Sequence, residues 1–75
     1  MLAKVFRNSA ARKVGIVLAE YGGEKAQVVL KTRLQPGGAA IRVESNLAES
    51  RQIPAAEELQ IELQPYEVRV LCLDQ

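Results

Sequence analysis

Three glutamates are the residues of this sequence whose type and spacing come nearest to catalytic chemistry. Glu44, Glu62 and Glu67 could line a cleft as an acid and base pair, the role that paired carboxylates play in many hydrolases. Each one falls on the polar phase of an alternating stretch, among cations such as Arg42 and Arg69. Cross-strand ion pairs on a solvated face account for that placement. We therefore predict no catalytic residue among them.

Cys72 is the single cysteine and the only candidate nucleophile of its kind. The chain has no His to activate it, and its neighbours Leu71 and Leu73 would raise its pKa. We predict a small hydrophobic side chain buried in the core instead. One cysteine without His can form neither an internal disulfide nor a zinc site, so the sequence predicts no metal and no cofactor.

Two glycine pairs could cradle a phosphate with their backbone amides. Neither Gly22-Gly23 nor Gly37-Gly38 belongs to a Gly-x-x-x-x-Gly-Lys motif or opens a clear helix. Turns account for both pairs, because glycine adopts positive φ without strain. We predict a hairpin turn at the first pair and a type II turn over residues 35–38, where Pro36 precedes Gly37.

Charge and aromatic content argue against nucleic acid as a partner. Single-strand binding needs exposed aromatic rings for stacking, and Phe6, Tyr21 and Tyr66 are the only ones. We assign Tyr66, which follows Pro65, a structural role in which its ring packs and its hydroxyl fixes a corner. Complementary charge between strands, or between copies, explains the uneven distribution of charges. Basic residues are denser in the first half (Arg7, Arg12, Lys13, Lys25, Lys31, Arg33) and acidic ones in the second (Glu44, Glu49, Glu57, Glu58, Glu62, Glu67).

Length and composition bound the class of protein. The 75 residues have room for one domain, residues 1–75, which buries only about 60% of its unfolded surface. Without disulfide or metal, self-association or membership of a larger protein would supply further burial. The net charge of +1 gives neither a nucleic-acid footprint nor attraction to a membrane surface. The start lacks the apolar stretch of a signal peptide, and no segment is long enough to span a membrane, so we expect the cytoplasm.

Hydrophobic alternation with a period of two predicts strands that must position these residues. The expected strands cover residues 13–21, 26–34, 39–45, 59–64 and 67–73, with a possible edge strand at 2–7. Asn46, Glu49 and Pro54 carry helix-start signals, so one or two helical turns are expected within 46–57. The fold class is therefore all-β: a small antiparallel sandwich or barrel of five to six strands. Its predicted core is Val28, Leu30, Leu34, Ile41, Val43, Ile61, Leu63, Val68 and Val70.

Residues 63–71, Leu-Gln-Pro-Tyr-Glu-Val-Arg-Val-Leu, resemble the closing strand of the C-terminal β domain of glycoside hydrolases of the α-amylase, α-glucosidase and β-galactosidase groups. Residues 43–46, 14–18 and 23–30 are similar to earlier parts of that domain, so the resemblance spans residues 13–73. The family usually has an Asn after the first strand, where this chain has Ala19-Glu20-Tyr21. The catalytic carboxylates of the family lie in its barrel domain, and no catalytic residue carries over. The resemblance implies a non-catalytic accessory module.

A second resemblance is to the OB-fold, whose order is three strands, a helix and two strands. Residues 59–66 are similar to the Val-x-Leu-x-Pro-Tyr stretch of bacterial translation initiation factor 1, and the whole chain resembles the TOBE domain of ABC-transporter ATPases. That resemblance implies a binding module for an oligonucleotide or a small oxyanion. We predict first a non-enzymatic module for protein–protein interaction that buries an apolar sheet face against a partner domain or a second copy, with the OB-fold module as the alternative.

Overall fold

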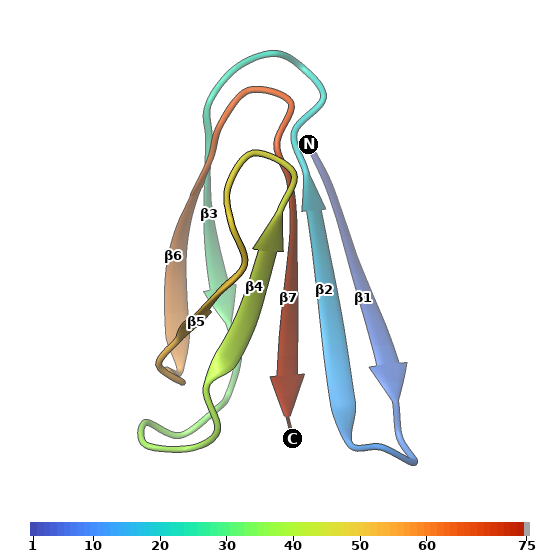
Figure 1. The fold of residues 1–75 in the computed structure, drawn as a ribbon, viewed down its shortest axis with the longest axis vertical. Coiled ribbons are helices and arrows are strands. Elements are labelled where there is room, and N and C mark those ends of the chain that lie inside the picture. The colour runs from blue at the N-terminus through green and yellow to red at the C-terminus, as the bar shows by residue number, and fades with distance from the viewer. Residues whose placement is uncertain (75) are drawn as a thin grey trace.

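The computed structural model describes residues 1–74, which form two antiparallel β-sheets facing each other (Figure 1). The larger sheet has five strands in the order β1-β2-β7-β4-β5, and the smaller sheet pairs β3 with β6. The prediction of an all-β, antiparallel fold is confirmed, but residues 1–74 form seven strands, not five to six, and these do not close into a barrel. The bounds are β1 Leu2–Asn8, β2 Lys13–Ala19, β3 Ala26–Lys31, β4 Ile41–Ser45, β5 Arg51–Ile53, β6 Glu58–Leu63 and β7 Val68–Asp74.

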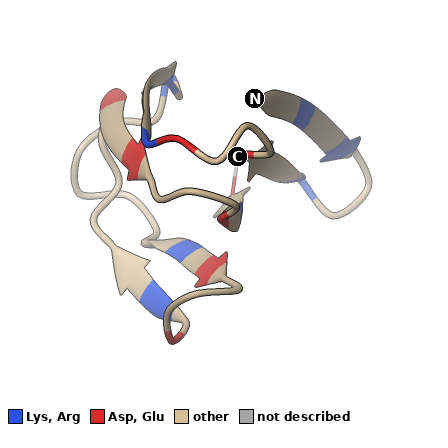
Figure 2. Cartoon of the chain, turned by 90° about the horizontal axis from the view of Figure 1, so that it is seen from above, with Lys and Arg blue, Asp and Glu red and all other residues tan. Residues whose placement is uncertain are grey.

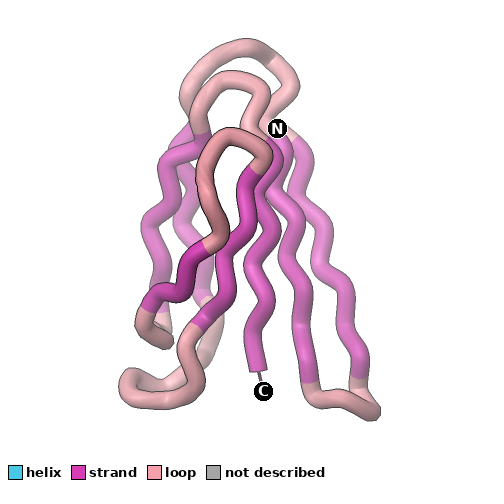
Figure 3. Tube along the Cα trace, in the orientation of Figure 1, coloured by secondary structure: helices cyan, strands magenta, loops and turns pink. Residues whose placement is uncertain are grey.

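The connection between β4 and β6 contains a strand where helical turns were expected. Figure 3 shows strands and loops but no helix in residues 1–74, and β5 lies at the edge of the larger sheet beside β4. Asn46 caps no helix; its side-chain oxygen accepts a 2.8 Å hydrogen bond from the Val68 amide. Asn and Ser side chains bond loop backbones as readily as helix ends, so their capping signal was misleading here.

The core lies between the two sheets. Its fully buried members come from β2, β4, β6 and β7, and Val28, Leu30 and Leu34 pack against them while only partly buried. Four predicted core residues, Ile41, Val43, Ile61 and Leu63, are buried as expected. The complete buried cluster is Val14, Leu18, Ile41, Val43, Ile61, Leu63, Leu71 and Leu73.

The predicted phase of β7 was wrong. Val68 is 39% exposed and Val70 is half-buried, whereas Leu71 and Leu73 enter the core. The inward phase of this segment begins with the ion pair of Glu67, which is buried, and Arg69, which is partly buried. Reading polar residues as outward therefore inverted the two faces of the strand.

Both glycine pairs lie in connections between strands, as predicted, but the two strands joined at Gly22-Gly23 do not pair with each other. Gly22-Gly23 is not a hairpin turn, because β2 belongs to the five-stranded sheet and β3 to the two-stranded sheet. The chain crosses between the layers there, with Gly23 at φ 79°. The type II turn at 35–38 has Gly37 at φ 88° and a 3.3 Å hydrogen bond from the Gly38 amide to the Gln35 carbonyl, as that turn requires.

β1 is an edge strand whose seven residues are all exposed. It pairs only with β2, in a register that sets Lys4 opposite Val17 and Phe6 opposite Gly15. At the other end of the molecule from the β1–β2 turn, the loops after β2, β4 and β6 come together, at the top of Figure 1. That loop end carries the buried charged groups of the protein.

Candidate functional site

The structure does not bring the three candidate carboxylates together. Glu44 lies on the exposed face of β4, where Arg42 of the same strand contacts it at 2.8 Å. Glu62 lies on the exposed face of β6 in the other sheet, 3.9 Å from Lys25. Glu67 is 2% exposed at the loop end. Surface ion pairs were the prediction for all three, and Glu67 departs from it.

Glu67 accepts hydrogen bonds on both carboxylate oxygens. Oε2 accepts from the Ser45 hydroxyl at 2.7 Å and from Arg69 Nε at 2.9 Å. Oε1 accepts from the Gln64 amide at 2.9 Å and from Arg69 Nη2 at 3.0 Å. This one side chain therefore ties together the end of β4, the β6–β7 loop and the start of β7.

The hydrogen bonds keep Glu67 ionised. Burial by itself raises the pKa of the Glu67 carboxyl, but donation from the Gln64 amide, the Ser45 hydroxyl and Arg69 outweighs burial. The positive charge of Arg69 adds to that effect, so the net pKa lies below its ordinary value. A carboxyl group whose pKa is lowered is a poor general acid near neutral pH.

Glu20 is a second buried carboxylate, and sequence reasoning missed it. It is 7% exposed, and it accepts backbone hydrogen bonds from Gly22 at 2.8 Å and from Gly23 at 2.7 Å. The amides of Glu24 and Tyr66 also donate to it, each at 3.2 Å. Burial raises the pKa of Glu20, but these backbone amides outweigh it and the net pKa is lowered.

The amide cluster at Gly22-Gly23 is the kind of concavity that binds anions in other proteins. Here the anion is the protein's own Glu20 carboxylate, which occupies the position that a phosphate would need. The sequence signal that could have revealed this is an acidic residue two positions before a glycine pair, at the end of a strand. The prediction that the pair serves a turn rather than a phosphate agrees with this geometry.

Tyr66 fixes the corner with its backbone amide and carbonyl, which corrects the prediction that its hydroxyl does so. Its amide donates to Glu20, and its carbonyl accepts a 3.2 Å hydrogen bond from Asn46 Nδ2. The ring lies over Gly23, because a Cβ built there would be 2.7 Å from the Tyr66 hydroxyl oxygen. The ring is otherwise open to solvent, at 64% exposed. The loop end is therefore a set of mutually bonded loops.

The outer face of the five-stranded sheet is apolar along β2 and β7 and is partly open to solvent. The paired registers place Val17 beside Val70 and Ala19 beside Val68, on the face opposite the core. The exposed fractions are 44% for Leu2 and 57% for Phe6 on β1. We call this surface the outer face; its members are Leu2, Lys4, Phe6, Asn8, Lys13, Gly15, Val17, Ala19, Arg42, Glu44, Gln52, Val68, Val70, Cys72 and Asp74.

Cys72 belongs to the outer face and is exposed, which corrects the prediction that it is buried. The error has the same origin as the phase of β7, since Cys72 shares its face with Val70 and lies opposite Gly15. No group of three or more His, Cys, Asp or Glu side chains suited to a metal ion occurs in residues 1–74.

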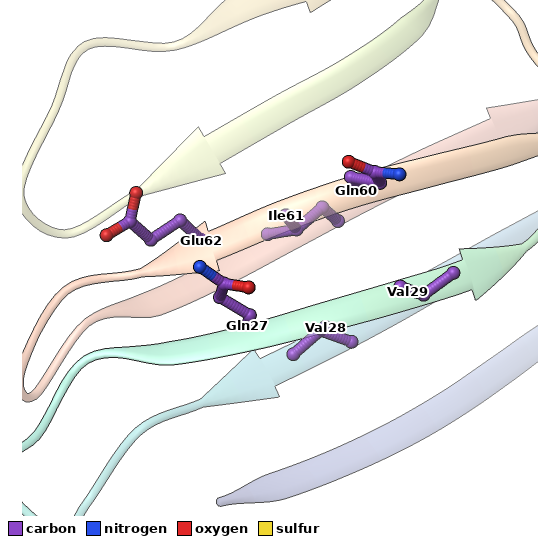
Figure 4. Close-up of a pocket in the computed structure, with 6 residues that line it drawn as sticks. All are labelled: Gln27, Val28, Val29, Gln60, Ile61 and Glu62. Atoms are coloured by element: carbon purple, nitrogen blue, oxygen red, sulfur yellow. The ribbon is translucent and has the colours of Figure 1, made fainter.

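Two surface cavities remain as candidate binding places. One, of about 410 Å³, runs over β3 and β6, where Gln27 and Glu62 reach the same side of the small sheet (Figure 4). The other, of about 650 Å³, is lined by Arg7, Lys31 and Arg33 together with Thr32, Leu34 and Gln35. Within residues 1–74, none of those three cations has a carboxylate within 4.0 Å.

Comparison with protein-family models, with curated proteins and with solved structures found no match to this chain. Within residues 1–74 there is no helix with the length and apolar character needed to cross a membrane. The candidate site therefore rests on this chain's own geometry: the bonded loop end, the outer face and the two cavities.

Proposed function

We propose that the protein is a non-catalytic interaction module, as its resemblance to the trailing β domain of carbohydrate-active enzymes implies. In this proposal the outer face is the binding surface, and it becomes buried against a protein partner. The observation that carries this proposal is the apolar row Val17–Val70, flanked by exposed Leu2, Phe6 and Val68. Contiguous apolar surface of this kind marks interaction sites on soluble proteins.

The two sheets of the same molecule provide an internal comparison. The outward positions of the small sheet are polar except for Val29, as expected for an antiparallel sheet that faces water. They are Gln27, Val29, Lys31, Glu58, Gln60 and Glu62. The outward positions of β2 and β7 are apolar between the terminal pair Lys13 and Asp74. Contact with water accounts for the polar outward residues of the small sheet. Contact with another protein surface would account for the apolar outward residues of β2 and β7.

The hydrogen bonds of the two buried carboxylates support a module without a catalytic role. Glu20 and Glu67 are held ionised, and their oxygens accept hydrogen bonds from the protein itself. The other candidate glutamates, Glu44 and Glu62, are in surface ion pairs on different sheets. These contacts support a structural role for all four carboxylates.

Polar substitution separates a surface kept for a partner from one kept for folding. Val68→Thr and Leu2→Gln should change the free energy of unfolding by about 0.5 kcal/mol or less, because both side chains are exposed. Leu71→Ala, on the core face of the same strand as Val68, should cost about 2–5 kcal/mol. Urea unfolding measures all three, and binding of a fluorescent apolar dye should fall only in the outer-face variants.

Two results would count against the interaction module. If Val68→Thr destabilises the chain as much as Leu71→Ala, the outer face belongs to the fold. If the purified chain hydrolyses a glycoside, the non-catalytic assignment is wrong.

A second candidate function is binding of a small oxyanion or an oligonucleotide, and the cavity of Arg7, Lys31 and Arg33 favours it. Binding of a labelled single-stranded oligonucleotide, measured by fluorescence anisotropy, should then weaken as salt rises. Arg7→Gln with Lys31→Gln should abolish that binding, and Lys25→Gln, outside the cavity, should not. Anisotropy that stays constant at low salt would remove this candidate.

A further inference from the structure

The outer face has an arrangement of charge that selects one kind of occupant. The registers place Lys4, Val17, Val70 and Glu44 in a single row across β1, β2, β7 and β4. A cation stands at one end of this row and an anion at the other, with two valines between them. The next row has Phe6 and Arg42 at its two ends, with Gly15 and Cys72 between.

We propose that the outer face binds a second copy of this chain, related by a two-fold axis that runs along the strands between β2 and β7. This rests on the proposed interaction function and names its partner. The axis exchanges the two ends of each row, so Lys4 lies over Glu44 of the second copy and Phe6 over Arg42. Val17 then packs on Val70 of the second copy, at the centre of the interface.

A third row obeys the same rule. Lys13 and Asp74 are paired neighbours on β2 and β7, with their charged atoms 3.2 Å apart. The same axis brings Lys13 over Asp74 of the second copy, so the pair becomes a group of four alternating charges. The dimer therefore sets no like charges together in any of the three rows, and it brings the cation Arg42 to the position of the Phe6 ring, where a cation–π contact can form.

Of the two-fold axes perpendicular to the strands, the one through the central row is disfavoured by the same charges. An axis perpendicular to the strands through the central row would place Lys4 over Lys4 of the second copy and Glu44 over Glu44. Like charges set together across an interface disfavour that arrangement. An axis midway between the Lys4 row and the Phe6 row would set Lys4 over Phe6 and Glu44 over Arg42, and the charge-reversal rescue below separates it from the proposed axis. The twist between packed sheets leaves the proposed contacts within reach. With about 30° between the strand directions of the two copies and about 4.8 Å between strands, Lys4 is displaced from Glu44 of the second copy by about 4 Å, a distance that long side chains span.

The size of the face sets the strength of the dimer. Three strands of seven residues and one of five, about 4.8 Å apart, present roughly 410 Å² on each copy. Two such faces bury about 800 Å², below the roughly 1,200 Å² of a standard specific interface, so the dimer should be weak. Figure 2 shows charges of both signs spread over the strands, as expected of a chain whose net charge of +1 does not oppose pairing.

Charge reversal and rescue test this arrangement. Within one molecule Lys4 and Glu44 are separated by two strands, about 14 Å, so they do not contact each other. We expect sedimentation of the full chain, from about 10 μM to 1 mM, to show reversible dimers. Lys4→Glu and Glu44→Lys should each weaken the dimer about tenfold, and the double variant should restore it. Lys25→Glu, which makes the same charge change beside the small sheet, should leave the dimer unchanged.

Cys72 distinguishes the proposed axis from the perpendicular axis through the central row. In the proposed dimer the two Cys72 Cα atoms are about 11 Å apart, beyond the reach of a disulfide. A short bismaleimide should therefore link the two copies, whereas oxidation should not. That perpendicular axis would separate these atoms by about 17 Å.

These results test the proposed dimer separately from the proposed interaction function. A chain that stays monomeric at 1 mM overturns the second copy as occupant. Dimers that ignore both charge reversals, or that no short bismaleimide links, overturn this axis. In all of these cases the interaction function stands if Val68→Thr leaves the stability unchanged, because the outer face then serves another partner.

Discussion

Glu20 and Glu67 show how single residues hold the loop end together. Each one is an ionised carboxylate surrounded by donors that the turns would otherwise leave unsatisfied. An unpaired buried amide costs about 1–3 kcal/mol, and one carboxylate satisfies several of them. These two carboxylates thereby supply the hydrogen-bond acceptors that the loop amides need.

The contact between Tyr66 and Gly23 gives a prediction at the residue scale. Gly23→Ala and Gly37→Ala should each cost about 1–2 kcal/mol, because both glycines have positive φ. Gly23→Ala should cost more, since its Cβ would meet the Tyr66 ring, whereas no atom lies within 4 Å of a Cβ at Gly37. Urea unfolding of both variants measures the difference.

The contact itself is isolated by repeating both substitutions in a Tyr66→Ala background. There the two glycine variants should become equal in cost, because the atom that Gly23→Ala meets is gone. A difference that persists without the ring would assign the extra cost to the Glu20 hydrogen bonds and not to Tyr66.

At the scale of the elements, β1 is the strand that the core needs least. All its residues are exposed and none belongs to the buried cluster. Deletion of residues 1–8 should therefore leave a folded chain, with a thermal midpoint lower by roughly 5–10 °C from the loss of pairing with β2. Near-ultraviolet circular dichroism and thermal unfolding measure this.

The control for the β1 deletion is Leu18→Ala on β2, which removes a fully buried side chain and should cost about 2–5 kcal/mol. The shortened chain should also lose self-association, because Lys4 and Phe6 leave with β1. A shortened chain that is unfolded at 25 °C would show that β1 contributes to the fold more than its exposure indicates.

β7 shows what alternation in sequence can and cannot predict. The run from Val70 to Leu73 is apolar on both phases, so it identifies a strand but not which face is inward. Leu71 and Leu73 face the core, and on the same phase Glu67 is buried while its ion-pair partner Arg69 is partly buried. The phase of β4 was predictable because its two faces differ clearly, with Ile41 and Val43 against Arg42 and Glu44.

The loop end was beyond sequence reasoning for a different reason. Glu20 and Tyr66 are 46 positions apart, and only the meeting of two loops makes the Tyr66 amide a donor to Glu20. Asn46 likewise bonds Val68, 22 positions away, instead of capping the local helix that its neighbours indicate. Local patterns predict local partners, and these partners are set by the order of strands in the sheets.

For the molecule as a whole, the inequality of the sheets determines which surfaces are open. Two strands face five, so no part of residues 1–74 covers β1 or the outer face. A chain of 75 residues buries a modest core, and pairing across the outer face would add apolar burial where the structure presents it. The unequal size of the two sheets therefore leaves exposed the surface that the proposed dimer would bury.

Acid should destabilise the whole molecule through its two buried carboxylates. The pKa values of Glu20 and Glu67 are lowered in the folded chain, so in acid the unfolded chain binds more protons than the folded one. Their contribution to stability is complete above the ordinary glutamate pKa of about 4.3 and is lost as pH falls through the folded values. Urea unfolding between pH 7 and pH 2.5 should show this loss. Glu67→Gln should cost about 1–3 kcal/mol at pH 7 and fall less steeply in acid. Glu44→Gln, an exposed control, should follow the wild type, and a stability that rises on acidification would contradict the assignment of both carboxylates as ionised.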